Sequence, residues 1–182
     1  MEQGNSIIYL QNIKATDMKM NLTDLKAKGF IGFKTMAELM VNPSLISQSK
    51  GVYVVLYQGE STPTFLRVGT GGFFKGKDPN VSLSELEDNW VDGTSIVYIG
   101  EAGGVGSSAS LQSRLKQYLR FGQGANVGHW GGRYIWQIAD AKNLVVCWKP
   151  LADADPREIE HQMIEEFKAS HHGLRPFANL KD

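Results

Sequence analysis

The chain has 182 residues, no net formal charge, 42% hydrophobic residues and 21% charged residues. This composition is typical of a globular protein that is long enough to bury one core. Its apolar runs are only as long as strands, far short of the roughly 20 residues that a membrane helix needs, so we expect no membrane partner. The N-terminus lacks the pattern of a signal peptide, and the single cysteine cannot form an internal disulfide. These features predict a cytoplasmic protein.

The two signs of charge are distributed unevenly along the chain. Between Ala102 and Lys149 there are six basic residues and one acid, a net charge of +5, whereas Pro150–His172 has two basic residues and six acids, a net charge of −4. A basic stretch beside an acidic one fits a phosphate-binding surface next to a metal-binding carboxylate. A pair of solvated faces would give the same counts.

The first fifty residues predict a small helical cap, with helical patterns at 22–28 and 35–41 separated by turn signals. A strand is predicted at 51–57, because this stretch begins at a glycine and is rich in β-branched and aromatic residues. A second strand is predicted at 64–68.

The stretch 69–93 predicts an insertion, because glycines and other turn-forming residues surround a short helical pattern at 84–90. A third strand is predicted at 94–100. It is followed by a helix at about 108–121, in which leucines recur every four residues and form an apolar stripe.

Two further strands are predicted at 134–138 and 144–148. Cys147 lies in the second of these apolar runs, which predicts a packing role for its thiol rather than a nucleophilic one. The last helix has a clear start, with Asp155 as its N-cap and Pro156 at its first position.

Glu160 is the most unusual residue of this last helix. At about 100° per residue, the apolar residues of the helix span an arc from about 0° at Ile159 to about 140° at Ile164, and Glu160 falls near 100°, inside that arc. A carboxylate turned inward is unfavourable by several kcal/mol unless it finds a partner or a metal ion. A buried ion pair would explain the position equally well.

Two other features accompany this glutamate. Arg114 and Tyr118 are four residues apart on the predicted helix at 108–121, so they point the same way, although this is also a common packing arrangement. Tyr53 and Tyr98 lie in predicted strands that, as neighbours, would bring their hydroxyl groups together.

In their order along the chain these features resemble the GIY-YIG nuclease superfamily. The two tripeptides are Gly51-Val52-Tyr53 and Tyr98-Ile99-Gly100, and the glutamate opens the run Glu160-His161-Gln162-Met163-Ile164. The remaining motif residues are Arg114, Tyr118 and Asn179. The run from Gly128 to Arg133, Gly-His-Trp-Gly-Gly-Arg, also resembles a subgroup of little-characterised bacterial proteins of this superfamily.

The resemblance implies an α+β fold, of mixed α/β composition, in which a small antiparallel sheet is flanked by helices. We expect a helical N-terminal cap at 1–50 and a nuclease domain at 51–182 with the insertion at about 69–93. The insertion makes the gap between Tyr53 and Tyr98 far longer than is usual in the family. The segment 169–174 also lengthens the distance from Glu160 to the final asparagine.

The resemblance further implies a divalent-metal-dependent endonuclease, a hydrolase of DNA phosphodiester bonds. Glu160 would hold Mg²⁺ or Mn²⁺, Arg114 would pair with the scissile phosphate, and one of the tyrosines would act as general base, with Tyr53 as the first candidate. The other predicted catalytic residues are Tyr98, Tyr118 and Asn179. The nearest candidates for contacts to DNA phosphates are Lys116, Arg120, His129 and Arg133.

Three alternatives remain at this point. The first is a module of the same fold that binds nucleic acid without cutting it. The second is a nucleotide-binding protein, because 104–109 fits a Gly-x-Gly-x-x-Ala fingerprint, although no acid lies about 20 residues further on. The third is a zinc site at His171 and His172, which lack further ligands at suitable spacing and fit better as a helix C-terminus.

Overall fold

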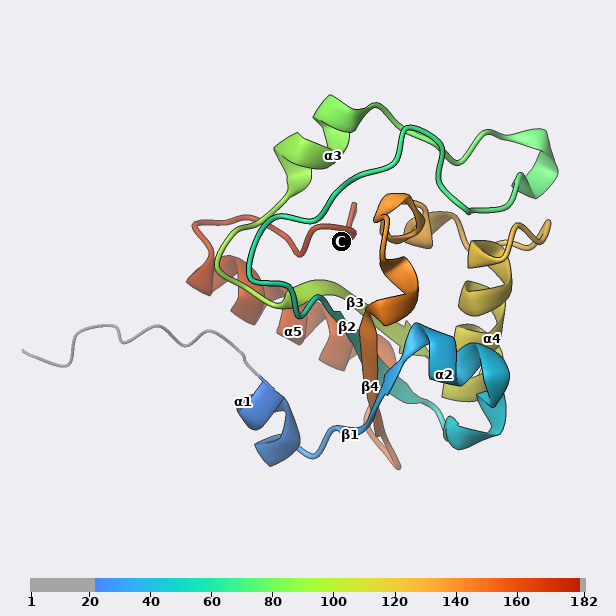
Figure 1. Cartoon of the computed structure of the whole chain (residues 1–182). Coiled ribbons are helices and arrows are strands. Elements are labelled where there is room, and N and C mark those ends of the chain that lie inside the picture. The colour runs from blue at the N-terminus through green and yellow to red at the C-terminus, as the bar shows by residue number, and fades with distance from the viewer. Residues whose placement is uncertain (1–21, 181–182) are drawn as a thin grey trace, which may run out of the picture.

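The computed structural model describes residues 22–180, and its centre is a four-stranded antiparallel sheet with the order β1-β4-β2-β3 (Figure 1). The strands are β1 (Ile31–Thr35), β2 (Gly51–Leu56), β3 (Ile96–Ala102) and β4 (Val145–Pro150). The α-helices of this part of the chain are α1 (Leu22–Ala27), α2 (Met36–Val41), α3 (Leu83–Asn89), α4 (Leu111–Gly122) and α5 (Pro156–Ser170). The predicted α+β class with a small antiparallel sheet is confirmed.

The central strand β2 divides the core into two parts. Because successive side chains of a strand point to opposite faces, Tyr53 and Val55 pack with α4 on one face, while Val52, Val54 and Leu56 pack with α5 on the other. The leucine stripe predicted for α4 is buried in the first part, and the apolar arc of α5 is buried in the second. Helices α4 and α5 therefore lie on opposite faces of the sheet.

Capping residues fix where these two helices begin. The Ser110 hydroxyl accepts a hydrogen bond from the backbone N–H of Ser113 at the start of α4, and the Asp155 carboxylate accepts one from Arg157 at the start of α5. The predicted N-cap of the last helix is confirmed. No helix within residues 22–180 is long and apolar enough to span a membrane.

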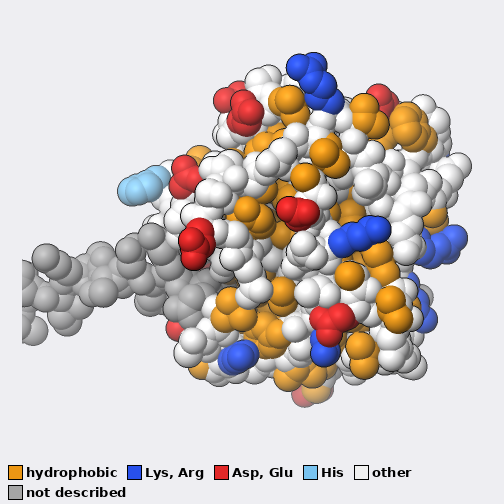
Figure 2. Space-filling view, in the orientation of Figure 1, with side chains coloured by type: hydrophobic (Ala, Val, Ile, Leu, Met, Phe, Trp, Pro, Cys, Tyr) orange, Lys and Arg blue, Asp and Glu red, His pale blue; other side chains and the backbone are white. Residues whose placement is uncertain are grey.

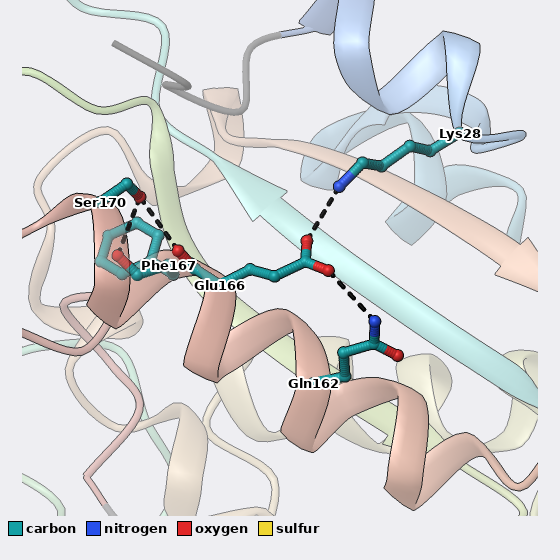
Figure 3. A network of polar contacts seen from close by, with 5 residues as sticks. All are labelled: Lys28, Gln162, Glu166, Phe167 and Ser170. Carbon is teal, nitrogen blue, oxygen red and sulfur yellow. Dashed lines mark hydrogen bonds and ion pairs between the residues drawn. The ribbon is translucent and has the colours of Figure 1, made fainter. Parts of the chain in front are cut away.

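The outward side of α5 carries its solvated carboxylates, as the helical arc predicts. Glu166 accepts hydrogen bonds from Lys28, which follows α1, at 2.9 Å and from Gln162 at 3.2 Å (Figure 3). The ion pair with Lys28 is exposed, so it contributes at most about 1 kcal/mol. Glu160 lies on a different side of the helix and is half-buried.

The helices predicted at 22–28 and 35–41 are present as α1 and α2, but strand β1, which lies between them, was not predicted. The strand pairs with β4, so it belongs to the same sheet as the rest of the domain. The pairing of β1 with β4 is irregular, because Gly32 and Phe33 both have positive φ and interrupt the register. Trp148 packs so closely on Gly32 that a Cβ there would lie 2.4 Å from its ring. Residues 1–21 of the predicted cap lie outside the described residues.

The strands predicted at 64–68 and 134–138 are also wrong. Phe65 and Ile138 form only an isolated bridge, and Ile135–Gln137 is a 3-10 helix. The buried side chain of Gln137 replaces a strand ladder there, because it donates to the carbonyls of Leu66 and Val81 and accepts from the Val81 N–H. The apolar residues of both segments pack in the core on the α4 side and do not form a strand of the sheet.

The insertion lies over the α4 side of the sheet, at the top of Figure 1. Its predicted helix is present as α3, and the ring of Trp90 packs on Phe65 and Phe177. The Tyr134 hydroxyl donates to the Glu85 carboxylate and ties α3 to the layer below. These contacts make the insertion part of the main core.

Candidate active site

The pairing of β2 with β3 brings two tyrosines together. Tyr53 lies opposite Gly100 and Tyr98 lies opposite Val55, so both rings are on the α4 face, with centroids 5.9 Å apart. Gly100 leaves room for the ring of Tyr53, because a Cβ at this glycine would lie 2.5 Å from the Cζ of Tyr53. The glycine that ends the second tripeptide is thus required by close packing against the tyrosine that ends the first.

Helix α4 adds Tyr118 and Arg114 to the same region. The Tyr118 ring stacks on Tyr98, with centroids 6.0 Å apart and planes at 10°. Burial raises the pKa of Tyr53 well above its usual value, the neighbouring Tyr98 raises it further, and the Arg114 guanidinium lowers it. The four side chains predicted from the two tripeptides and this helix therefore come together.

Helix α5 brings Glu160 to this cluster from the opposite face of the sheet. Burial raises the pKa of Glu160 to about 7, the Glu101 carboxylate raises it further, and Arg114 and Arg157 lower it. The Glu160 charge in turn raises the pKa of Tyr98, after burial, which is the larger cause. The charge of Arg114 on α4 therefore acts on Glu160 of α5 past the edge strand β3.

Glu101 is a member of this cluster that the sequence reasoning missed. It lies near the end of β3, and its Oε2 accepts a hydrogen bond from the N–H of Gly104 at 3.1 Å. It is the only acid between residues 93 and 139, and it directly follows Gly100. An isolated acid at the end of an apolar strand was the signal that could have identified it.

His129 lies on the inner side of the tyrosine cluster. Its ring contacts Tyr118 edge to face, with centroids 4.4 Å apart, and only 3% of the residue is exposed. Burial, followed by the charge of Arg114, lowers the pKa of His129 to about 3, so the imidazole is neutral at pH 7. A buried, neutral side chain does not fit the predicted contact to a DNA phosphate, so we correct that prediction.

Several polar atoms of this cluster are buried without a hydrogen bond to any residue in the described range. They are the Tyr118 hydroxyl and both ring nitrogens of His129. Most buried polar atoms in proteins have a partner, so such groups are expected mainly where function or an unseen ligand requires them. Tyr98 is buried as well, and its hydroxyl interacts with that of Tyr53.

Asn179 lies beside the cluster, but its amide contacts the backbone. Its Oδ1 accepts from the N–H of Ile99 at 2.9 Å, and its Nδ2 donates to the carbonyl of the same residue at 2.8 Å. The N–H of Ala178 donates to the carbonyl of Val97. The C-terminal segment therefore pairs with the outer edge of β3 next to Tyr98.

The remaining predicted DNA contacts lie nearer the surface. Lys116 and Arg120 are exposed on α4, one turn apart, and Lys116 donates to Gln112 at 3.2 Å. Arg133 is half-buried, with its guanidinium 5.2 Å from the centre of the Tyr134 ring. These three positions leave the prediction of phosphate contacts open.

The carboxylates of the cluster suit a hard divalent cation. Within residues 22–180 no group of three or more His, Cys, Asp or Glu side chains is arranged to hold a metal ion. The Glu101 carboxylate, however, is near enough to Glu160 to add to the rise in its pKa that burial causes. Such a pair fits Mg²⁺, which usually takes one or two carboxylates together with substrate oxygens and water.

The alternative sites find less support. The sheet is antiparallel throughout, and α4 begins at Leu111 rather than at the glycine-rich fingerprint, so the strand–helix–strand context of a dinucleotide site is absent from residues 22–180. The ring of His171 stacks on Phe167, and its Nδ1 lies 2.9 Å from the carbonyl of Phe167. This position fits the C-terminus of α5.

Comparison with known proteins finds no matching family model, no similar curated protein and no similar solved structure.

Proposed function

We propose that this protein is a divalent-metal-dependent endonuclease that hydrolyses DNA phosphodiester bonds with a site of the GIY-YIG type. One observation carries the proposal: the charges of Arg114, on one face of the sheet, and of Glu160, on the other, both act on the pKa of Tyr98 on the edge strand. Phosphodiester hydrolysis requires a cation, a carboxylate and a hydroxyl group close together at the reacting phosphate.

Each side chain then has a task set by its chemistry. Arg114 has a planar set of donors that matches the oxygens of the scissile phosphate. Glu160, with Glu101 beside it, would hold Mg²⁺ or Mn²⁺. When bound, the metal ion would neutralise charge that develops on the phosphate. The Tyr98 hydroxyl, whose pKa responds to the charges of both Glu160 and Arg114, would orient the phosphate or the attacking water.

The structure argues against Tyr53 as a general base in the free protein. Because burial raises its pKa, this tyrosine keeps its proton at neutral pH. We therefore assign Tyr53 and Tyr118 the task of holding the ring of Tyr98 in place, through contacts at 5.9 and 6.0 Å. We assign Asn179 a positioning task as well, because its amide binds the backbone next to Tyr98.

The test is cleavage of supercoiled, branched and single-stranded DNA by the purified protein with Mg²⁺ or Mn²⁺. We expect cleavage that stops when EDTA removes the metal, and a loss of at least about 100-fold in Glu160→Gln. Glu158→Gln is the matched control, because Glu158 is exposed on the same helix. Cleavage by Glu160→Gln at the rate of the unmodified protein would contradict the assignment.

A DNA-binding module without catalytic activity is the second candidate. The protonated state of the buried Tyr53 and Tyr118 favours it, because neither hydroxyl is ready to accept a proton. Binding of the same DNAs without cleavage, under every metal condition, would support this second candidate.

A further inference from the structure

The segment Gly128–Gly132 covers the tyrosine cluster at the site. His129 is its buried anchor against Tyr118, and its backbone is folded tightly, with hydrogen bonds from the His129 N–H to the Val127 carbonyl and from the Gly132 N–H to the His129 carbonyl. The segment therefore contacts the Tyr118 ring through His129 and Gly132.

Two glycines of this segment face the cluster at different distances. A Cβ at Gly132 would lie 2.2 Å from the ring of Tyr118 and 3.0 Å from that of His129, so no side chain fits there. A Cβ at Gly131 would lie 3.6 Å from the hydroxyl of Tyr98, which is an ordinary contact distance. Gly131 is exposed, and its φ lies outside the left-handed region. Folding alone therefore does not require glycine at position 131.

We propose that His129–Gly132 is the wall that confines a DNA phosphate against the Tyr98 hydroxyl, and that Gly131 lacks a side chain so that the phosphate can enter. This inference rests on the proposed nuclease function. A methyl group at position 131 would occupy space within contact distance of the Tyr98 hydroxyl. A phosphate or a water that approaches this hydroxyl needs the same space.

Gly131→Ala tests the proposal, with Gly128→Ala as the matched control in the same segment. A Cβ at Gly128 would contact the ring of Phe74 at 3.1 Å instead of Tyr98. We expect Gly131→Ala to melt near the temperature of the unmodified protein and to lower kcat/KM for DNA cleavage by about 10-fold or more, because a displacement of about 1 Å at a reacting group can cost about 100-fold. Gly128→Ala should lose some thermal stability and keep its cleavage rate.

DNA binding provides a second measurement that does not depend on cleavage. With Ca²⁺ in place of Mg²⁺, fluorescence anisotropy with a labelled DNA duplex should show weaker binding by Gly131→Ala than by Gly128→Ala. If the unmodified protein binds but does not cut, this difference supports the wall while the nuclease proposal fails. If Gly131→Ala binds and cuts like the unmodified protein, the wall is wrong while the nuclease proposal stands. If the unmodified protein neither binds nor cuts DNA, both proposals fail.

Discussion

At the scale of single residues, Glu160 has the clearest energetic signature. Its pKa is raised from 4.5 to about 7, so the folded protein holds a proton on this carboxyl over a pH range in which the unfolded chain releases it. This contribution to stability is fully present below about pH 4.5 and is lost as the pH rises through about 7. At neutral pH and above, the ionised Glu160 therefore destabilises the fold, as expected for a residue kept for chemistry.

Glu160→Gln should therefore stabilise the metal-free protein at pH 8 and leave its stability nearly unchanged at pH 4. The expected gain at pH 8 is about 1–3 kcal/mol, because one pKa unit corresponds to about 1.4 kcal/mol and the site is partly open to solvent. Urea unfolding in EDTA at the two pH values measures this difference. A variant that is less stable than the unmodified protein at pH 8 would contradict the assignment.

Mg²⁺ adds an independent check on the same residue. A cation that binds the folded state at Glu160 should raise the urea midpoint of the unmodified protein at pH 8, because binding to the folded state stabilises it. The same concentration of Mg²⁺ should leave the midpoint of Glu160→Gln unchanged. An equal increase in both proteins would place the metal elsewhere.

At the scale of secondary-structure elements, the edge strand β3 positions the site. Its inner side pairs with β2, and its outer side pairs with the C-terminal segment through Ala178 and Asn179. The amide of Asn179 acts as a short substitute for a neighbouring strand. The position of Tyr98 therefore depends on a residue 81 positions further along the chain.

Asn179→Ala should lower the free energy of unfolding by about 2–4 kcal/mol, because it leaves the N–H and the carbonyl of Ile99 buried without partners. Urea unfolding measures this loss, and hydrogen exchange should show faster exchange at the Ile99 amide. Asn89→Ala is the control, because Asn89 is exposed and donates a single hydrogen bond to the Glu85 carbonyl. If Asn179→Ala lost activity at unchanged stability and exchange, Asn179 would be catalytic rather than a positioning residue.

The elements that the sequence predicted well are those with a local signal. Helix α5 has its cap and proline in the first turn, and β2 and β4 are continuous apolar runs. Strand β1 and the 3-10 helix at Ile135–Gln137 lack such a signal, because the first contains two residues with positive φ and the second is held by the side chain of Gln137. Contacts between distant segments determine both.

The residues of the candidate site also fall into two groups, those with a local sequence signal and those whose positions depend on contacts between distant segments. The inward position of Glu160 could be predicted from helical periodicity, because one helix determines it. The burial of His129 and the effect of the Glu101 charge on Glu160 could not be predicted, since both depend on how α4 and α5 pack on opposite faces of the sheet.

At the scale of the whole molecule, charge limits how DNA could be bound. The chain has no net charge, and the face in Figure 2 shows basic and acidic side chains interspersed. Binding over a large part of the surface is therefore not expected. A few local cations would supply the phosphate contacts, and Lys116 and Arg120 are suitably exposed on α4, the helix that carries Arg114.

The double variant Lys116→Ala/Arg120→Ala should bind DNA more weakly and with a shallower dependence on salt. Each phosphate contact contributes about 0.9 to the slope of log K against log salt, so removing two contacts should reduce the slope by about 2. Anisotropy titrations between about 50 and 200 mM salt measure it. The control is Lys26→Ala/Lys142→Ala, which removes two exposed cations from other elements and should leave the slope unchanged. Equal slopes for both double variants would exclude α4 as the DNA-facing helix. Removing cations from a surface that contacts DNA must reduce the number of counterions released on binding, and with it the slope.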